Sequence, residues 1–286
     1  MSVPNISTVG VVGAGTMGVG IVYVFAEAGC AVTVAEPDHA RAAGAQKAVI
    51  ARADKLQDQG RLTSEQADHI RTAVAVVESV EALPSQLDLV VEAVPEDLEL
   101  KQSILGAAEN REPKLLATNT SALSISSIAK SLRHPQNLIG LHFFNPVWSM
   151  PLLEIVRGSD TPAEAVETAR QIGRLIGKET IVVRDFPGFA TSRLGVALGL
   201  EAIRMLEDEV ADAEDIDRAM VLGYRHPMGP LRLTDLVGLD VRLHIARQLS
   251  ESLGPRFAPP QLLIDKVAAG QLGKKSGRGF FEWGGA

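Results

Sequence analysis

The sequence is sparing with cysteine. Its 286 residues include one, Cys30. A single cysteine excludes an internal disulfide and is normal for a protein of the reducing cytosol. Because Cys30 falls in a tight turn that we expect between a helix and a strand, we assign it a packing role.

The sequence also has fewer basic than acidic residues. The chain carries 28 Lys and Arg against 35 Asp and Glu, which gives a formal net charge of −7. Nucleic-acid binding needs a basic face that neutralises phosphates, so this balance argues against DNA or RNA as a partner. Any polyanionic ligand must instead be bound by basic side chains gathered locally.

Long uninterrupted apolar runs are missing as well. The most membrane-like stretch, residues 9–35, has Glu27 as its only charge, but repeated glycines break it and no basic flank precedes it. We therefore expect no membrane span. No signal peptide is visible either, so we expect a cytoplasmic protein.

What the chain does contain is a regular alternation of short strands and longer helices. Hydrophobic residues make up 46% of the sequence, enough for one large domain or two ordinary ones. From residue 9 to about 185, Val/Ile/Leu-rich segments alternate with amphipathic ones, such as "TVGVVGAG" before a helix at 16–28 and "AVTVAE" before a polar helical region at about 40–73. Apolar strands separated by helices predict a parallel sheet covered on both faces, a doubly wound α/β domain.

Beyond "DFPG" at 185–188 the strand signals almost vanish. Helical periodicity covers residues 189–207, 213–222, 231–253 and 260–269, and Asp212 is suited to cap the second of these helices. We therefore expect two domains, residues 1–186 and an all-helical domain at 187–286.

A glycine-rich turn follows the first predicted strand. Gly13, Gly15 and Gly18 have G-x-G-x-x-G spacing and open a helix. The first glycine makes the tight turn, the second lets the backbone approach a pyrophosphate, and the third lets helix and strand pack closely. We assign Thr16 and Met17, which lie between the last two glycines, to the same dinucleotide site.

An acidic residue supports this assignment. Glu36 ends the second predicted strand, eighteen positions after Gly18, where a carboxylate can accept hydrogen bonds from the adenine-ribose diol. The same carboxylate would repel a 2′-phosphate, so NAD is favoured over NADP. FAD uses a similar fingerprint, and the residues alone leave it open.

Two titratable residues stand out in the later strands. His142 and Glu154 lie among Leu, Ile and Phe residues in segments that otherwise predict buried strands. A lone histidine there is usually a packed core residue, but a buried glutamate needs a partner and a nearby histidine supplies one. A carboxylate that holds one imidazole nitrogen fixes the tautomer and leaves the other nitrogen as a base.

A third polar feature ends the strand "KLLATNT". The strand ends in Asn119, Thr120 and Ser121, and ligands of open α/β sheets bind at the carboxyl ends of strands. A hydroxyl at this place can reach a substrate. Helix capping is the alternative explanation, because Ser121 and Ser124 both precede helical residues.

Together these segments resemble a known family. "VGVVGAGTMG", "EAVPEDLELK", "TNTSALSIS", "GLHFFNPV", "MPLLEIV", "DFPGF", "EDIDRAMVLGYRHPMGPLRLTDLVGLD" and "GKKSGRGFFEW" look, in that order, like the L-3-hydroxyacyl-CoA dehydrogenases, which include bacterial 3-hydroxybutyryl-CoA dehydrogenases. The resemblance covers about residues 6 to 283. It implies a Rossmann-like N-terminal domain, a helical C-terminal domain that forms a homodimer, and NAD-linked oxidation of a CoA thioester.

The resemblance also assigns residues. His142 matches the catalytic base, Glu154 the carboxylate that orients it, and Ser121 a serine that hydrogen-bonds the reacting oxygen. Taken alone, the charged residues among the cofactor matches would pass for surface charges and Asn145 for a turn residue. The positions that match cofactor contacts are Glu36, Glu96, Lys101, Ser121, Asn145 and Lys275.

Two departures from the family pattern concern the substrate. Ser192 stands where the family usually has an asparagine of the substrate-binding catalytic set, so we expect altered but retained substrate binding, unless Ser192 only starts a helix. After Glu36 the family places a Ser and a Lys near CoA. The basic residues nearby are Arg52, Lys55 and Arg61, which are CoA contacts by this argument and solvated helix positions otherwise.

The predicted reaction is removal of the C3 hydroxyl proton by His142 while hydride passes to NAD. Two alternatives stay open: the same fold acting on a free hydroxy acid or polyol, as in gulonate- and carnitine-type relatives, and a non-catalytic NAD-binding protein. We assign no metal site. No hydratase-like segment accompanies the motifs, so we expect a monofunctional chain. The sequence does not determine the acyl-chain length or the pathway, which could be butanoate or fatty-acid metabolism among others.

Overall fold

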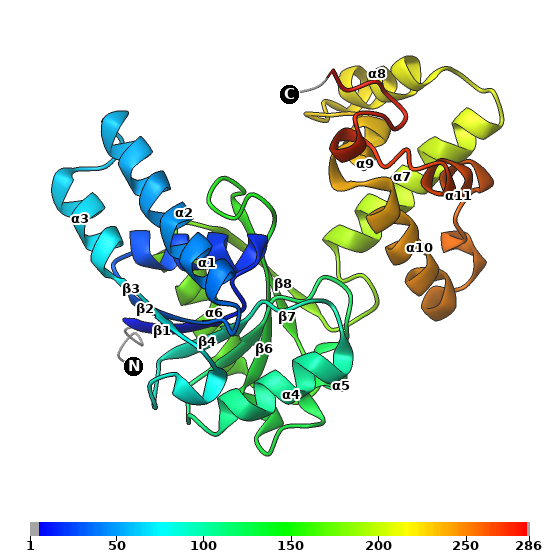
Figure 1. Cartoon of the computed structure of the whole chain (residues 1–286). Coiled ribbons are helices and arrows are strands. Elements are labelled where there is room, and N and C mark those ends of the chain that lie inside the picture. Colours follow the sequence, from blue (N-terminus) through cyan, green and yellow to red (C-terminus); the bar gives the residue numbers. More distant parts are fainter. Residues whose placement is uncertain (1–5, 285–286) are drawn as a thin grey trace. The chain divides into compact units, whose positions relative to one another are not determined.

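The computed structural model describes residues 6–284, which divide into two compact units between Asp185 and Phe186. The first unit is built on a sheet and the second on helices, as Figure 1 shows. The prediction of a doubly wound sheet followed by a helical region is therefore confirmed.

Within the described residues, eight strands form one sheet in the order β3-β2-β1-β4-β5-β6-β7-β8. The chain runs outward from β1 to β3, then returns to β4 on the other side of β1. This reversal places a switch point beside the carboxyl end of β1. The strands are β1 (Thr8–Val12), β2 (Ala31–Ala35), β3 (Val74–Val77), β4 (Leu89–Glu92), β5 (Leu116–Thr118), β6 (Leu138–His142), β7 (Leu152–Arg157) and β8 (Glu179–Arg184).

The sheet departs from the expected all-parallel arrangement at β7. β7 pairs antiparallel with β6, and β8 is parallel to β7, so the last two strands run against the others. The connection 143–151 explains the reversal, since a parallel crossover needs about a dozen residues or more, usually with a helix. As a result, the start of β7 lies at the same edge as the end of β6.

Helices cover both faces of the sheet (Figure 1). α1, α2 and α6 contribute to the main core on one face, while α4 and α5 pack on the other against β4, β5 and β6. The bounds are α1 (Thr16–Glu27), α2 (His39–Asp58), α3 (Ser64–Thr72), α4 (Leu98–Glu109), α5 (Ile125–Ala129) and α6 (Ala163–Leu175), with single 3-10 turns at Val80–Ala82 and Pro135–Asn137.

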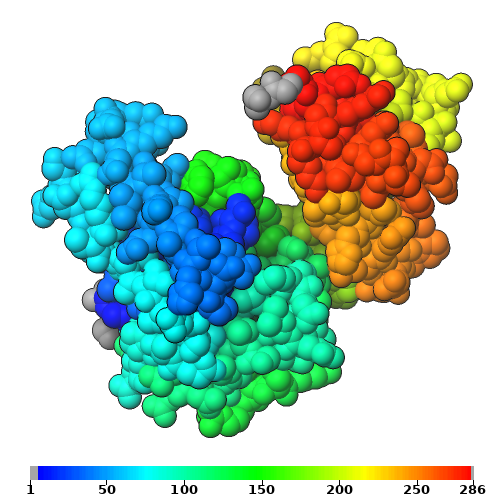
Figure 2. Space-filling model, viewed as in Figure 1, coloured from blue at the N-terminus to red at the C-terminus, as the bar shows by residue number. Residues whose placement is uncertain are grey.

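The polar helical region expected at 40–73 is two helices, α2 and α3, instead of one. α3 begins with a capping box: the Thr63 hydroxyl accepts from the Gln66 backbone N–H at 3.2 Å, and the Gln66 side chain accepts from Thr63 N at 2.9 Å. Helical periodicity runs through both helices, so it could not show the break between them. Figure 2 shows this helical pair projecting from the body of the first unit.

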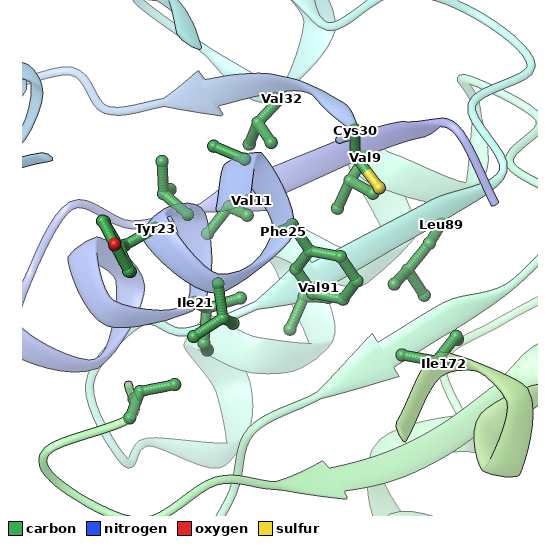
Figure 3. Packing of buried hydrophobic residues seen from close by; sticks show 14 of the residues in the cluster. Val9, Val11, Ile21, Tyr23, Phe25, Cys30, Val32, Leu89, Val91 and Ile172 are labelled. Carbon is green, nitrogen blue, oxygen red and sulfur yellow. The ribbon is translucent and has the colours of Figure 1, made fainter. Parts of the chain in front are cut away.

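The core of the first unit centres on α1. Figure 3 shows Ile21 and Phe25 of α1 directed at the strand residues Val11 and Val91. Ile21, Phe25, Val11 and Val91 are fully buried. Cys30 is buried in the same cluster, with Sγ 3.5 Å from the Ile6 carbonyl oxygen, and burial raises the pKa of its thiol to about 11. This matches the packing role expected for Cys30.

Asp88 fastens the beginnings of β1 and β4 together. Its Oδ2 accepts hydrogen bonds from the backbone N–H groups of Ser7 and Thr8 at 2.8 and 3.0 Å, and its Oδ1 accepts from Lys114 Nζ at 2.7 Å. Burial opposes the ionisation of Asp88, but these hydrogen bonds outweigh it and hold the pKa of Asp88 well below its usual range.

We predict that Asp88→Asn lowers the free energy of unfolding by about 1–3 kcal/mol at neutral pH, because charge-assisted hydrogen bonds are lost at a buried position. A carboxyl whose pKa falls on folding stabilises the protein above its unfolded pKa of about 3.9 and loses that contribution as pH drops through the folded value. Urea unfolding from neutral pH down to about pH 3 measures this. The difference between the two proteins should shrink in acid, and a difference that stays constant would contradict the account.

The second unit has its own helical core. Asp212 caps α8, as expected, by accepting from Asp215 N at 2.8 Å. The segment expected as one helix at 231–253 is broken at Gly238, whose φ of +103° is open to glycine and strained for other residues. The helices are α7 (Thr191–Glu207), α8 (Ala213–Tyr224), α9 (Pro230–Val237), α10 (Leu239–Leu253) and α11 (Gln261–Ala268), with 3-10 turns at Pro255–Phe257 and Lys274–Ser276.

Asp235 at the end of α9 holds the last segment of the described chain. Its carboxylate accepts from the backbone N–H groups of Phe280 and Phe281 and from Trp283 Nε1, at 2.8 to 3.0 Å.

Among residues 6–284, no helix is long and apolar enough to cross a membrane.

Candidate active site

The polar residues singled out in the first unit gather at one edge of the sheet. Gly13 follows β1, Glu36 follows β2 and Asn119 follows β5, while His142 is the last residue of β6. Because these strands are parallel, their carboxyl ends meet at the same edge. The antiparallel β7 brings its beginning, with Glu154, to that edge too.

The glycine turn is shaped by close backbone packing. Gly13 has a φ of +99°, and a Cβ there would lie 2.9 Å from the Ala93 carbonyl oxygen. A Cβ on Gly18 would collide with the carbonyl oxygen of Gly13. Gly15, the N-cap of α1, has open space where its side chain would be, and no side chain caps the helix. The first turn of α1 therefore presents backbone N–H groups to a phosphate.

A cleft of about 640 Å³ adjoins this turn. Its lining includes Gly13, Gly15, Thr16, Met17 and Glu36, all of which were expected at the cofactor. The shape and the donors suit a dinucleotide, with the pyrophosphate at the helix start.

Glu36 forms hydrogen bonds that its position in the sequence did not indicate. Its Oε2 accepts from Ala14 N at 3.0 Å and its Oε1 from Asp38 N at 3.0 Å, so the carboxylate ties the glycine turn to the end of β2. Arg41, which sequence reasoning missed, lies 3.1 Å from Oε1 and also lines the cleft. Where β2 ends, the cleft thus holds one negative and one positive side chain.

We predict that Glu36→Gln narrows the preference for NADH over NADPH by about tenfold or more, because the charge that repels a 2′-phosphate is removed while Arg41 stays. Steady-state kcat/KM with each cofactor measures this preference. The double variant that combines Glu36→Gln with Arg41→Met serves as the control and should reverse the gain in NADPH use. An unchanged preference in Glu36→Gln would count against the ribose assignment.

His142 and Glu154 are directly opposite each other on β6 and β7. His142 Nδ1 lies 2.8 Å from Glu154 Oε2, and the two side chains are 8% and 0% exposed. A carboxylate buried this completely requires a donor, so Nδ1 carries the proton and donates it to Glu154. That tautomer presents Nε2 as the proton-accepting nitrogen.

Two further contacts lie close to this pair in the chain, and neither was predicted from the sequence. The Phe144 ring packs on the imidazole, with ring centroids 4.4 Å apart and planes inclined at 48°. Asn119 Oδ1 accepts from Phe143 N at 2.9 Å, which holds the segment after β6 against the end of β5. The Asn119 side chain was visible as a polar residue at a strand end, but its partner could not be inferred from spacing.

Ser121 is held by Glu96. The Glu96 Oε1 accepts from the backbone N–H groups of Ser121 and Ala122 at 2.9 and 3.0 Å, and from Thr120 Oγ1 at 2.6 Å. Burial opposes the ionisation of Glu96, but the Lys101 ammonium and these hydrogen bonds outweigh it and keep the pKa of Glu96 below its usual value. Ser121 does not cap α5. That role belongs to Ser124, which accepts from Ser127 N at 3.1 Å.

Lys101, expected to contact the cofactor, is fully buried. Its ammonium donates to Glu92 Oε1 at 2.7 Å and to the Val94 carbonyl oxygen at 3.2 Å, and lies 3.4 Å from Glu96 Oε2. Glu92 is fully buried too and was not singled out from the sequence, because a glutamate in an apolar strand gives no sign of its partner. Glu92, Lys101 and Glu96 form a chain of charges that ends on the Ser121 segment.

The loop after His142 is fastened from two sides. Lys178, the residue before β8, donates to the carbonyl oxygens of Val147 and Met150 at 2.6 and 2.7 Å, and burial lowers the pKa of Lys178. On the other side, the Arg52 guanidinium carbon lies 4.3 and 4.8 Å from the ring centroids of Trp148 and Tyr23. Asn145, an expected cofactor contact, is exposed at the beginning of this loop.

We predict that Lys178→Met lowers the free energy of unfolding by about 1–3 kcal/mol, because two loop carbonyls lose a buried donor while the hydrophobic volume is kept. Denaturant unfolding measures this, with Lys130→Met, at an exposed position of the same unit, as the matched control. Equal stability of both variants and the wild type would contradict the anchoring role.

The remaining predicted substrate and cofactor residues are spread more widely. Lys55 and Arg61 are exposed on or just after α2, in contrast to the half-buried Arg52. Ser192 and Lys275 belong to the second unit, Ser192 as the second residue of α7. Lys275 Nζ lies 2.6 Å from Asp240 Oδ2.

Hydride exchange with a dinucleotide needs both a phosphate-binding turn and a nearby group that moves a proton. The carboxyl ends of this sheet hold both, so fold and site define a dinucleotide-dependent oxidoreductase.

Comparisons with known proteins narrow this class of oxidoreductases to one family. Residues 8–186 match the 3-hydroxyacyl-CoA dehydrogenase NAD binding domain, and residues 188–283 match the C-terminal domain of the same family. The chain is 42% identical to a Mycobacterium tuberculosis 3-hydroxybutyryl-CoA dehydrogenase over 97% of this chain and 99% of the relative. It is 38% identical to an Escherichia coli 3-hydroxyadipyl-CoA dehydrogenase over 98% of this chain and 59% of the relative.

A solved structure agrees with these relatives. The (S)-3-hydroxybutyryl-CoA dehydrogenase of Ralstonia eutropha superposes with a TM-score of 0.93 at 34% identity, covering 98% of this chain and all of that chain. The chain therefore belongs to the 3-hydroxyacyl-CoA dehydrogenase family, and its cofactor is NAD.

Proposed function

We propose that the protein oxidises L-3-hydroxyacyl-CoA thioesters to 3-ketoacyl-CoA with NAD, reversibly, with His142 as the general base. The observation that carries this proposal is the buried contact between His142 Nδ1 and Glu154 Oε2 at 2.8 Å, at the same edge of the sheet as the dinucleotide cleft. A protein that only binds NAD has no need of a buried acid–base pair at the strand ends.

In the proposed reaction, His142 Nε2 takes the proton of the substrate C3 hydroxyl. Glu154 stabilises the imidazolium that results, since its carboxylate already accepts from Nδ1. The Ser121 hydroxyl, which donates to Glu96 Oε1 at 3.3 Å in the structure, turns its proton to the C3 oxygen of the bound substrate and polarises it. Bound NAD supplies the acceptor for the C3 hydride.

The remaining contacts are assigned by the same proposal. The turn at Gly13, Gly15, Thr16, Met17 and Gly18 holds the pyrophosphate, and Glu36 the ribose. Other cofactor contacts are Glu96, Ser121, Asn145 and Lys275, together with Lys101, which is fully buried and has to become accessible to reach the cofactor. Arg52, Lys55 and Ser192 serve the CoA thioester. For Arg52 this requires it to bind CoA while packed between two rings.

Residues 1–186 serve as the NAD-binding domain and residues 187–286 as the domain for substrate and dimerisation. Exposed apolar side chains on the second unit support a homodimer, among them Leu194 at 70%, Leu222 at 69% and Tyr224 at 76% exposure. The single, buried cysteine supports a place in the reducing cytoplasm.

The direct test is NADH oxidation with acetoacetyl-CoA and with free acetoacetate. The proposal predicts turnover of the thioester and little of the free acid. Turnover of the free acid alone would favour a hydroxy-acid dehydrogenase, and NAD binding without turnover of either would favour a binding protein.

His142→Gln should lower kcat by about a hundredfold to ten-thousandfold, because general-base catalysis contributes on that scale, while NAD affinity changes little. Glu154→Gln should also lower kcat, since the imidazolium loses its charged partner. Titration of NAD by fluorescence separates binding from turnover. Near-normal kcat in His142→Gln would contradict the assignment of His142 as the general base.

The pH dependence has a definite sign. Oxidation requires a proton acceptor at His142 and reduction requires a proton donor there, so kcat for the 3-hydroxyacyl substrate should rise with pH while kcat for NADH-dependent reduction should fall. His142→Gln should abolish this dependence. A flat wild-type profile for the chemical step would argue against proton transfer by histidine.

A further inference from the structure

Three charged side chains of the first unit form a cluster whose charges do not cancel. Glu92 and Lys101 are fully buried, and Glu92 Oε1 lies 2.7 Å from Lys101 Nζ. Glu96 Oε2 lies 3.4 Å from the same ammonium, and the Glu96 side chain is 28% exposed. Two carboxylates share one ammonium, so the cluster carries an excess of one negative charge.

Each carboxylate is also held by neutral donors. Glu92 Oε1 accepts from Val94 N at 2.7 Å, and Glu92 Oε2 accepts from Thr118 Oγ1 at 2.6 Å. Glu96 Oε1 accepts from Ser121 N at 2.9 Å. Donors of this kind stabilise a carboxylate in its charged form. Both negative charges are therefore fixed parts of this edge of the sheet at neutral pH.

The cluster borders the cofactor cleft on the side of the proposed chemistry. Glu92 is the last residue of β4, and residues 93–95, which follow it, line the cleft. Glu96 Oε1 lies 3.3 Å from Ser121 Oγ, the hydroxyl that the proposed function assigns to the substrate C3 oxygen. Hydride transfer needs the reacting carbon atoms about 3–3.5 Å apart, so these contacts place the nicotinamide ring within roughly 10 Å of the Glu96 carboxylate.

The two forms of the cofactor differ in charge only at this ring. The nicotinamide of NAD⁺ is a cation, and the added hydride makes it neutral in NADH, while the phosphates and riboses are the same in both forms. A fixed negative charge near the ring therefore attracts the oxidised form more than the reduced one. Buried charges are screened little by salt, and one charge at roughly 10 Å changes a binding constant by up to about tenfold.

We propose that Glu92 is a specificity-determining residue for the redox state of the cofactor: the charge that it adds to the cluster raises the affinity for NAD⁺ relative to NADH. This inference rests on the proposed function, which places the nicotinamide beside Ser121. Glu92 is fully buried and acts through its charge and not by touching the cofactor. Without Glu92, the charges of Lys101 and Glu96 would cancel, and the ring would face a neutral pair.

A purely structural role of the cluster is the alternative. In that case, loss of Glu92 would loosen the segment that carries Ser121 and would weaken the binding of both cofactor forms alike. Glu154 adds a separate negative charge at this edge, but substitutions within the cluster leave it in place. The ratio of the dissociation constants of NAD⁺ and NADH separates the two accounts, because contacts to the shared parts of the cofactor cancel in it.

The test measures the Kd of NADH by fluorescence and the Kd of NAD⁺ by displacement, without substrate and at neutral pH. Glu92→Gln keeps the side-chain volume and removes one negative charge, so the ratio of the Kd of NAD⁺ to the Kd of NADH should rise about threefold to tenfold. The double variant that combines Glu92→Gln with Lys101→Met again has an excess of one negative charge, on Glu96. It should return the ratio to the wild-type value although it has lost more contacts.

Two further variants complete the comparison. Glu96→Gln, at a partly exposed position, removes the same unit of charge and should raise the ratio as Glu92→Gln does. Glu109→Gln, the matched control, alters a buried carboxylate about 12 Å further along α4 and should leave the ratio unchanged. If Glu92→Gln folds poorly, Glu96→Gln and the double variant still decide.

A wild-type ratio in both Glu92→Gln and Glu96→Gln would overturn the inference. A ratio that moves further from wild type in the double variant than in Glu92→Gln would overturn it too, since the effect would then follow lost contacts instead of charge. Turnover of acetoacetyl-CoA by the wild type tests the proposed function separately. A ratio that follows the charge, in a protein that turns over no thioester, would count against the proposed function alone.

Discussion

The antiparallel pairing of β6 with β7 is the constraint on which the site depends. It sets His142 directly opposite Glu154 and closes the contact between Nδ1 and Oε2 at 2.8 Å. In a wholly parallel sheet the beginning of β7 would lie at the far edge, and the glutamate would be remote from the histidine. A short connection between two strands thus determines whether the two residues can act as one unit.

The surrounding charges are arranged to hold this edge still. Glu92 and Lys101 form a fully buried ion pair, and Glu96 extends it to the segment that carries Ser121. Breaking such a network is costly because each charge would be left buried without a partner. Lys178 fixes the loop that follows His142 in a comparable way, by donating to two carbonyl oxygens. The reacting groups are therefore positioned by buried polar contacts as well as by apolar packing.

Much of this could be predicted from the sequence, and what could not has physical reasons. Apolar segments predicted each strand of the sheet, and the glycine spacing with Glu36 predicted the nucleotide cleft. Periodicity could not show the break at Gly238, since apolar positions continue in register across it while its φ of +103° ends α9. The aromatic partners of Arg52 come from separate elements, α1 and the loop after β6, so local sequence carries no sign of them. The burial of Arg242 on α10, which is 6% exposed, could not be predicted either, because an arginine on a predicted helix is normally solvated.

The central claim is that Glu154 makes His142 a base at Nε2, and nitrogen NMR of the imidazole tests it most directly. With the histidines labelled and His142 assigned by comparison with His142→Gln, the neutral ring should carry its proton on Nδ1. Glu154→Gln should weaken this tautomer preference. A neutral His142 protonated on Nε2 in the wild type would contradict the account.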